Sequence, residues 1–478
     1  MLDELSALMA AATGHCDYAD VRRVARRDEA ILARNGRVER LDASETDGVG
    51  VRVRTAGAWG FASTGDLSAS GMQAALRRAL AFAQALPAGP AAGLAPSPPA
   101  RGTWAGPCGR DPFAVSLEEK LDLLLAAAGA LAADQRIVRA DASCTARRTT
   151  TALASTEGTA CTQTVTECGG GIQAVAVAGD EVQIRSHPGA HDGSVAAAGW
   201  EHVLALDLAG HAPRVAGEAI ALLTAPDCPA AVTTVVLHGE QVALQVHESV
   251  GHALELDRML GGEASYAGTS WVSPGDLGSL RYGSDRMTVT ADATLPGALG
   301  TFAWDDEGVA ARSFALVDRG TLTGVLSSRE SAAAIGLPAS GGCARADGHD
   351  RQPIVRMTNV SLEPGSAGSL ADLIADTDDG LYLETNRSWS IDDRRLHFQF
   401  GTELAREIRG GELGRLVRNP TYAGVTPRFW AGLDAVCSPE AWSAWGLTNC
   451  GKGEPGQAMR VSHGAAPARF RDVQVGVA

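Results

Sequence analysis

The sequence predicts an α+β protein in which a mixed α/β N-terminal domain precedes a β-rich C-terminal domain. Hydrophobic residues are 45% of the 478 residues and charged residues 20%, as in an ordinary globular chain long enough for two or three domains. Helical periods and β-branched runs are mixed in the first half, whereas pairs of strand patterns follow one long helix in the second. The 56 glycines indicate many turns, and therefore much β structure.

Two amphipathic helices are predicted in the first half. Helical periodicity extends over residues 70–86 and 116–133, and the second period begins with Ser116 and Glu119 in the spacing of a capping box. Between them, residues 87–112 are rich in Pro, Ala and Gly, which predicts an exposed loop.

Strand patterns surround these helices. Valines alternate with arginines at residues 51–54, and a β-branched run at 172–184 is interrupted by a Gly-Asp turn. A further helical period at 204–223 ends at an Ala-Pro-Asp-Cys-Pro sequence, where two prolines break the pattern. We therefore place a boundary near residue 228, which gives an α/β domain of residues 1–228 and a β-rich domain of residues 229–478.

The second half opens with a predicted strand at residues 231–237 and a helix at about 240–259. Pairs of short strands then flank an Asp-Arg-Gly turn within residues 313–326 and a Gly-Gly turn within residues 403–417. We expect a β-rich domain that carries one important helix.

Charge and composition exclude several classes of function. Acidic residues outnumber basic ones by 56 to 41, and the formal charge of -15 would repel a phosphate backbone, so we expect no nucleic-acid partner. The N-terminus lacks the basic start of a secretion signal, and the longest strongly apolar stretch, residues 123–133, is too short to span a membrane. Nine cysteines without a regular framework indicate free thiols, mostly buried or half-buried. We expect a cytoplasmic protein.

The predicted helix at 240–259 contains His247-Glu248-x-x-x-His252. Two histidines five residues apart point roughly 140° away from each other on an ideal α-helix, so they could not share a ligand. A π-type turn would bring both rings to one side, and Gly251 would tolerate the distorted backbone. The alternative is a pair of ordinary helix histidines, one buried and one exposed.

If the two histidines bind a metal, Glu248 is placed to act as a general base that takes a proton from water. Two residues could supply the third ligand. Glu255 lies three residues after His252, on nearly the same helical face. Cys450 lies far downstream in a glycine-rich segment, where its thiolate could approach closely. The chemistry of the residues alone leaves this choice open.

Several separated segments of the second half form a distinctive set: HESVGHALELD at His247–Asp257, FAWDDEGVAAR at Phe302–Arg312, RMTNV at Arg356–Val360, NRSWSIDDRRLHFQFG at Asn386–Gly401, RNPTYAGVTPRFW at Arg418–Trp430 and NCGKGEPGQ at Asn449–Gln457. Together they resemble the TldD/PmbA family of zinc metallopeptidases, in particular its catalytic TldD-type members.

The resemblance implies that His247, His252 and Cys450 bind Zn²⁺, with Glu248 as the catalytic residue and Glu255 in a supporting role. It implies hydrolysis of peptide or amide bonds in small, unfolded or modified peptides. It also implies a dimer, with either a TldE/PmbA-like partner chain or a second copy. Some members of the family serve natural-product pathways, so a tailoring hydrolase is included in this expectation.

Two other functions stay open at this point. Cys450 could be the nucleophile of a cysteine hydrolase, or the chain could be a non-catalytic binding subunit of a peptidase complex. The sequence does not assign roles to the charged segments Asp305–Glu307 and Asp392–Arg394, which could line a cleft or form surface turns.

Overall fold

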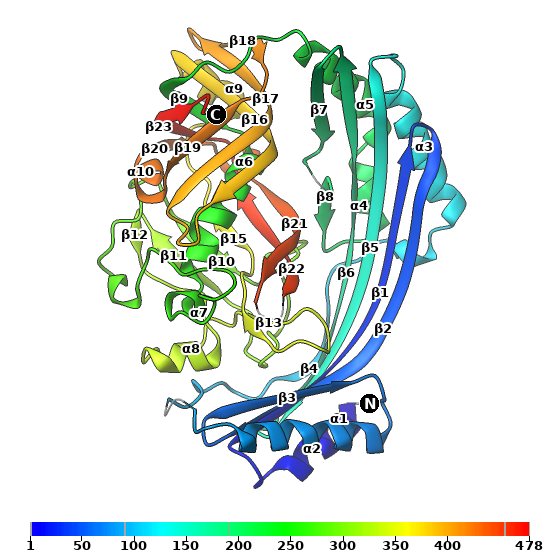
Figure 1. Cartoon of the computed structure of the whole chain (residues 1–478), viewed down its shortest axis with the longest axis vertical. Helices are drawn as coiled ribbons and strands as arrows, with labels where there is room; N and C mark the ends of the chain where they lie inside the picture. Colours follow the sequence, from blue (N-terminus) through cyan, green and yellow to red (C-terminus); the bar gives the residue numbers. More distant parts are fainter. Residues whose placement is uncertain (1, 90–91, 191, 454–455, 478) are drawn as a thin grey trace.

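The computed structural model describes residues 2–89, 92–190, 192–453 and 456–477, which form two parts facing each other along the molecule (Figure 1). The N-terminal part is a long curved sheet with helices on its outer side, and the C-terminal part is rich in strands. The predicted fold class is therefore confirmed. The domain boundary near residue 228 stays a prediction.

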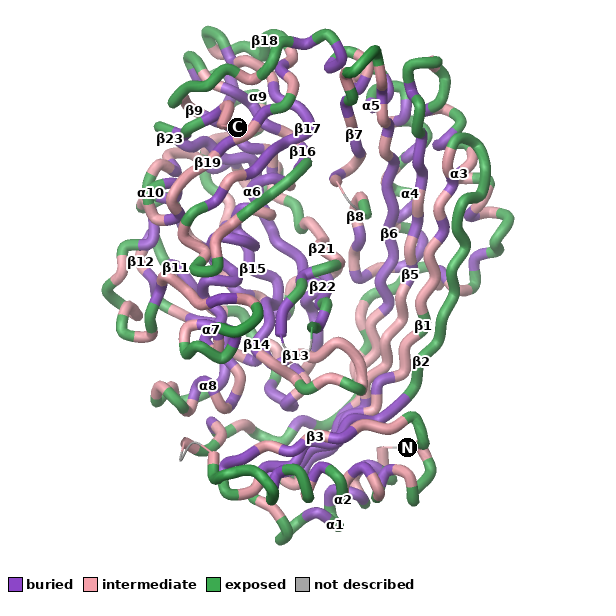
Figure 2. The backbone as a smooth tube through the Cα atoms, in the orientation of Figure 1, coloured by how far each residue is buried: buried purple, intermediate pink, exposed green. Residues whose placement is uncertain are grey.

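The N-terminal sheet has the strand order β3-β2-β1-β5-β6-β4, and both β7 and β8 also pair with β6. Four of the strands have 17 to 19 residues, so the sheet is about 60 Å long. Its strands are β1 (Tyr18–Arg34), β2 (Arg37–Thr55), β3 (Ala58–Thr64), β4 (Arg101–Ala105), β5 (Ile137–Ser155), β6 (Ala160–Ala178), β7 (Glu181–His187) and β8 (Ser194–Ala196). Residues 37–47 of the outer strand β2 are all exposed (Figure 2).

Helices cover one face and one end of this sheet (Figure 1). The outer face is covered by α3 (Leu117–Leu131), α4 (Trp200–Ala205) and α5 (Leu208–Leu222), whose apolar side chains pack on β1, β5 and β6. The end is covered by α1 (Leu2–Ala12) and α2 (Ala69–Ala85). The Ser116 hydroxyl accepts a hydrogen bond from the Glu119 N–H at 3.2 Å, which confirms the predicted start of α3.

Two local predictions were wrong in this half. The helix expected at 204–223 is two helices, because Asp207 adopts a left-handed conformation (φ 43°) and its carboxylate caps α5 by accepting from the Gly210 N–H. The expected loop at 87–112 contains β4, which pairs in parallel with β6. Five residues at a sheet edge are too few to show a strand period in the sequence.

The C-terminal part is built around a closed ring of strands. The strand β16 (Asp379–Ile391) pairs with both β9 (Ala231–Leu237) and β17 (His397–Arg409), and β19 (Thr421–Val425) and β23 (Ala468–Val475) complete the ring in the order β16-β9-β23-β19-β17. The helix α6 (Gly239–Val246) follows β9 and is fixed to the ring, because Tyr422 of β19 hydrogen-bonds to Gln241 and Gln245 of α6.

Smaller units complete this part. They include the sheet β12-β11-β10-β15 and a hairpin of β21 (Ser443–Lys452) and β22 (Gln457–Ala465) that lies between the ring and the N-terminal sheet. The remaining elements are β10 (Val289–Asp292), β11 (Ser313–Asp318), β12 (Thr321–Leu322), α8 (Arg329–Ala334), β13 (Ala344–Arg345), β14 (Ile354–Val355), β15 (Val360–Leu362), α9 (Leu370–Ala375), β18 (Glu412–Val417), α10 (Thr426–Ala431) and β20 (Leu433–Val436). In the part of the chain that the structure describes, no helix is both long and apolar enough to cross a membrane.

A buried arginine connects the two parts. Arg185 of β7 is fully buried, and its guanidinium contacts three carboxylates: Glu218 of α5 at 3.0 Å, Glu384 of β16 at 2.8 Å and Glu403 of β17 at 3.3 Å. A charge without water is stable only where such partners satisfy it. This cluster therefore fixes how the N-terminal sheet sits on the strand ring.

We predict that Arg185→Met lowers the free energy of unfolding by about 3–5 kcal/mol, because three carboxylates would remain together without their cation. Arg214→Met is the matched control: Arg214 binds the same Glu218 at 3.0 Å, but it is 41% exposed and should contribute only about 0.5 kcal/mol. Urea unfolding followed by circular dichroism measures both. Equal effects of the two substitutions would contradict the structural role of Arg185.

Candidate metal centre

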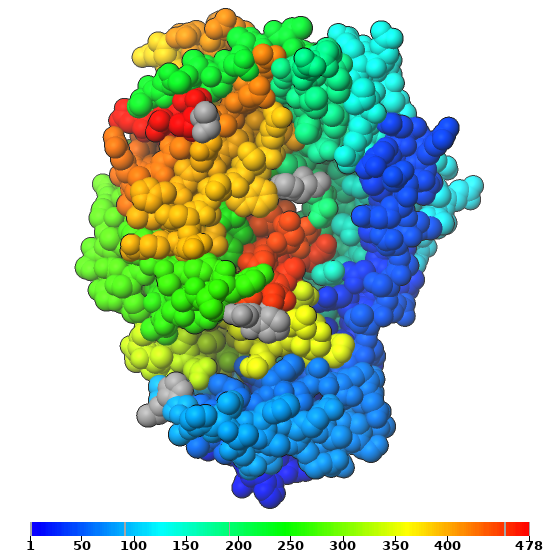
Figure 3. Space-filling view, in the orientation of Figure 1, coloured from blue at the N-terminus to red at the C-terminus, as the bar shows by residue number. Residues whose placement is uncertain are grey.

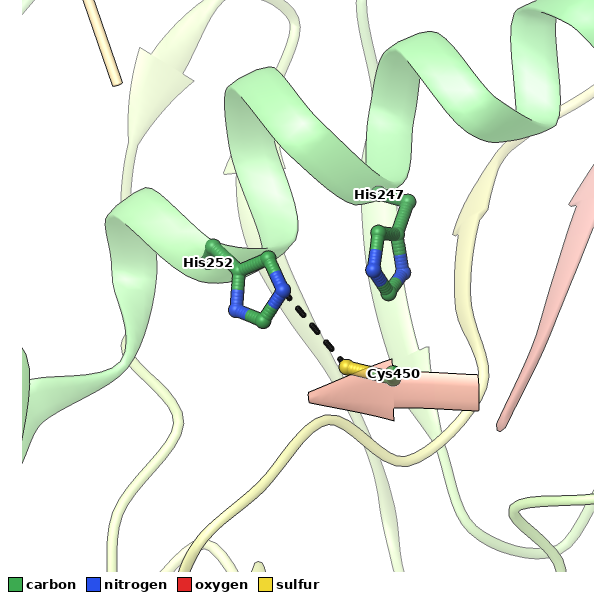
Figure 4. A group of neighbouring side chains, drawn as sticks. All are labelled: His247, His252 and Cys450. Carbon is green, nitrogen blue, oxygen red and sulfur yellow. Dashed lines mark hydrogen bonds between the residues drawn. The ribbon is translucent and has the colours of Figure 1, made fainter. Parts of the chain in front are cut away.

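The helix after β9 changes its winding where the two histidines lie. α6 is α-helical to Val246, and residues His247–Gly251 then form a π-helical turn. The His252 N–H donates to the His247 carbonyl oxygen, five residues earlier. The predicted π-type turn is thus confirmed. It brings the two imidazole rings to the same side, with their centroids 4.7 Å apart (Figure 4).

Gly251 is needed for a different reason from the predicted one. Its backbone is ordinary right-handed helix (φ -54°, ψ -61°), a conformation that any residue type can adopt, so the conformational freedom of glycine is not required there. A Cβ atom at this position would lie 2.1 Å from the Sδ atom of Met357, so the glycine allows close packing instead. The helix also ends earlier than predicted: Glu255 is extended, and only a short α7 (Leu256–Met259) follows it.

Three possible metal ligands converge below this turn. Ligand atoms of His247, His252 and Cys450 all lie within 4.8 Å of one another, and all three residues are buried. Cys450 comes from β21, and its Sγ atom is 3.5 Å from Nε2 of His252 (Figure 4). The hairpin that carries Cys450 lies in the seam between the two parts of the molecule (Figure 3). Residues about 200 positions apart in the sequence are therefore brought together.

Hydrogen bonds on the far side of each ring indicate which nitrogen is free. Nδ1 of His463 is 2.7 Å from the Val360 carbonyl oxygen and must donate to it, so Nε2 of His463 accepts from Nδ1 of His247 at 2.7 Å. Nδ1 of His252 donates to Glu255 at 2.9 Å. His247 and His252 therefore both keep the lone pair of Nε2 available, as metal-binding histidines in known sites do.

Burial keeps these rings neutral. It lowers the pKa of His247 to about 4, with nearby Glu248 opposing the shift, and it lowers the pKa values of His252 and His463 well below the ordinary value. A neutral imidazole is the form that can bind a metal.

Cys450 differs from the other cysteines. Burial alone would raise the pKa of its thiol, but the Arg356 guanidinium opposes burial and the pKa is lowered. Shifts in the other eight cysteines, all within the described residues, raise the thiol pKa. All nine thiols are free, as predicted, although Cys108 is exposed rather than buried.

Glu255 supports the site rather than joining the three donor atoms. One of its oxygens accepts from His252 and lies 3.3 Å from Nζ of Lys452. Lys452 follows Cys450 by two residues, is fully buried, and also binds Asp257 at 2.7 Å. It therefore ties the cysteine strand to the histidine helix. No sequence pattern indicated this role, although the lysine lies two residues after the cysteine, between two glycines.

Glu248 lies in the same cavity as the three donor atoms and forms an ion pair there. Its Oε2 atom is 2.7 Å from Nη1 of Arg395, and the two side chains are 8% and 16% exposed. Arg395 was also missed, because the predicted charged segment ended one residue before it. The cavity has a volume of about 370 Å³ and is lined by Leu244, His247, Glu248, His252, Trp389, Ser390, Ile391, Arg395, Leu447, Asn449, Cys450 and Gly451.

The other charged segments singled out in the sequence do not line this cavity. Asp392 organises the turn between β16 and β17 by accepting from the N–H groups of Leu396 and His397, while Asp393 and Arg394 are exposed. Asp305 and Glu307 are buried and bind backbone N–H groups, and Glu307 also contacts Arg52 of the N-terminal sheet.

The donor set fits a zinc ion. Two neutral imidazole nitrogens and one acidified thiol are the ligand types that this borderline-soft ion prefers. Each histidine is oriented by a partner behind it, as in known metal sites.

Comparison with known proteins identifies a family of metallopeptidases. A family model described as the PmbA/TldA metallopeptidase C-terminal domain matches residues 230–477, and models of domain 1 and of the central domain match residues 19–83 and 110–224. A Methanothermobacter thermautotrophicus protein named metalloprotease is 29% identical over 99% of this chain and 98% of its own length.

Two further proteins are similar. The Saccharolobus solfataricus protein named zinc metalloprotease TldD homolog is 25% identical over 51% of each chain. The solved structure of TldE from Thermococcus kodakarensis superposes with a TM-score of 0.75 at 14% identity, over 99% of this chain and 100% of that one. The likeness to the TldE structure shows a shared fold.

Proposed function

We propose that this chain, which belongs to the PmbA/TldD metallopeptidase family, is a zinc-dependent hydrolase of peptide or amide bonds. In this proposal His247, His252 and Cys450 hold the metal, and Glu248 is the general base. The observation that carries it is the convergence of three buried donor atoms within 4.8 Å, beside a carboxylate that lines the same cavity. The names of the relatives, metalloprotease and zinc metalloprotease, support it.

The chain's own residues divide the work as follows. Bound zinc would supply Lewis acidity, which polarises a carbonyl group and makes water a stronger acid. Glu248 takes the proton from water in the cavity and passes it to the leaving amine. Arg395 holds one Glu248 oxygen, Oε2, and so fixes the direction of the carboxylate.

The dimensions of the site favour small substrates. A cavity of about 370 Å³ is at the lower end of the range for small-molecule pockets, so a folded protein could not enter it. We therefore propose small, unfolded or modified peptides as substrates. Nine free thiols suit a reducing compartment, so we also propose a cytoplasmic location.

One observation favours a second candidate, a cysteine hydrolase. The thiol of Cys450 contacts His252 at 3.5 Å, and its pKa is lowered, as a nucleophile would require. A chelator separates the two functions, because it would abolish the zinc activity and leave a thiol enzyme active.

We predict that Glu248→Gln keeps one zinc per chain but lowers the hydrolysis rate by about 10²–10⁴-fold, because an amide cannot accept the proton from water. Metal analysis of the purified variant and a peptide cleavage assay measure the two effects. If the folded variant lost its zinc, Glu248 would be a ligand and not a base.

We predict that Cys450→Ser severely weakens zinc binding, since a neutral hydroxyl is a far poorer donor than a thiolate. Glu255→Gln should lower the zinc affinity only about 10–100-fold, as loss of a supporting partner does, and retain the metal at saturation. Zinc content is measured beside a circular-dichroism spectrum, because a bound metal also stabilises the fold. Full zinc occupancy in a folded Cys450→Ser protein would refute the assignment.

We propose that the chain acts as a dimer, with a TldE/PmbA-like partner if the source organism has one, or otherwise with a second copy. The shared fold with TldE supports this proposal, and the exposed strand segment 37–47 offers an edge for association. We predict a dimer by light scattering at micromolar concentration. A monomer under these conditions, with the partner chain added, would contradict it.

A further inference from the structure

A single cation faces the proposed catalytic groups. Among the described side chains that line the cavity, Arg395 is the only arginine or lysine. It comes from the turn between β16 and β17, whereas the metal ligands come from the helix after β9 and from β21. The cavity therefore has one cationic side chain, ion-paired with Glu248, that is separate from the proposed metal donors.

The ion pair with Glu248 leaves part of the guanidinium unused. Nη1 binds Oε2 of Glu248 at 2.7 Å, while Nε is buried and has no hydrogen-bond partner among the described residues. Arginine presents five N–H groups in a planar fork, and a carboxylate binds that fork through two parallel hydrogen bonds. Nε has almost no exposed surface, so a ligand would meet the outer end of the fork, where Nη2 has no hydrogen-bond partner among the described residues and is suited to an anionic group.

The backbone at this position is held in a conformation that a side chain rarely adopts. Arg395 has a φ of 63°, in the left-handed region where glycine is preferred. The turn is fixed from both sides: the Arg395 N–H donates to the Asp392 carbonyl oxygen at 2.9 Å, and the Thr426 hydroxyl donates to the Arg395 carbonyl oxygen at 2.8 Å. Strain that the surroundings hold in place tends to occur at ligand-binding sites.

We propose that Arg395 is the anchor for a substrate carboxylate, so that the enzyme prefers peptides with a free carboxylate close to the bond that is cut. This inference rests on the proposed function and specifies its substrate class. The anchor, the base and the metal donors share one cavity of about 370 Å³, so the carboxylate and the scissile amide must be separated by few bonds. A peptide cleaved near its C-terminus meets this condition, and so does one with an acidic side chain there.

The reaction itself remains simple hydrolysis. The amide C–N bond breaks, the acyl carbon takes the hydroxyl group of water, and the amine takes the proton that Glu248 transfers. Arg395 binds and positions the substrate carboxylate, and it neither gains nor loses a proton in the reaction.

The test compares peptides that differ only in charge. N-acetyl-trialanine is offered with a free C-terminal carboxylate, as its C-terminal amide, and as an amide with glutamate in the last position. The zinc-loaded wild-type protein should cleave the free acid with a kcat/KM about tenfold or more above that of the amide. Activity on the glutamyl amide, but not on the acid, would assign the subsite to an acidic side chain instead of the chain end.

Arg395→Gln should bring the ratio of acid to amide cleavage close to one, and Arg395→Lys should leave an intermediate ratio because the charge remains without the fork. Arg394→Gln is the matched control, since it removes the same charge from the exposed neighbouring residue and should keep the wild-type ratio. An equal fall in acid and amide cleavage in Arg395→Gln would overturn the proposal and leave Arg395 as a positioning residue for Glu248.

A binding measurement separates this proposal from the proposed function. Calorimetric titration with N-acetyl-dialanine and with its amide needs no hydrolysis. One outcome is that the wild-type protein binds the acid but cleaves no peptide, and that Arg395→Gln abolishes this binding. This outcome would refute the hydrolase function and keep the subsite. Peptide cleavage without any preference for the acid, together with acid binding that Arg395→Gln leaves unchanged, would refute the subsite alone.

Discussion

The site depends on one buried group of charges. Lys452 contacts Glu255 in the interior and Asp257 at its partly exposed edge, and Glu255 at the same time orients the ring of His252. A buried charge without a partner is unfavourable, so these contacts are kept. They fix the distance between the cysteine strand and the histidine helix, and they fix the direction of the His252 ring. The π-helical turn then places His247 beside His252. The donor atoms are thus pre-positioned by the protein itself.

The local features of this arrangement could be predicted from the sequence, and the tertiary ones could not. Two histidines five residues apart require a π-type turn to share a ligand, so the spacing predicted this winding on the condition that both bind one metal, and the structure has the turn. No local pattern marks His463, whose importance comes from a hydrogen bond to His247 across 216 positions. Arg395 lies in a charged turn that looks like many solvated turns, and its role follows only from the position of Glu248.

A charged segment can also be buried where its sequence suggests a surface turn. The acidic run at residues 305–307 resembles a surface turn, yet Asp305 and Glu307 are buried. Their carboxylates satisfy backbone N–H groups, and Glu307 meets Arg52 from the opposite sheet. The contact between Glu307 and Arg52 joins residues 255 positions apart in the sequence. Composition and periodicity describe one segment at a time and cannot reveal such a contact.

The order of the strands has a consequence for synthesis of the protein. The ring of strands that supports α6 is closed by β23 at Ala468–Val475, and Cys450 lies on the hairpin just before it. Translation proceeds from the N-terminus, so the histidines leave the ribosome long before the residues that complete their surroundings. A nascent or prematurely terminated chain would therefore lack both the closed ring and the thiol donor. In a cell, this arrangement would keep the proposed metal centre from forming until the hairpin of β21 and β22 and the strand β23 have been made.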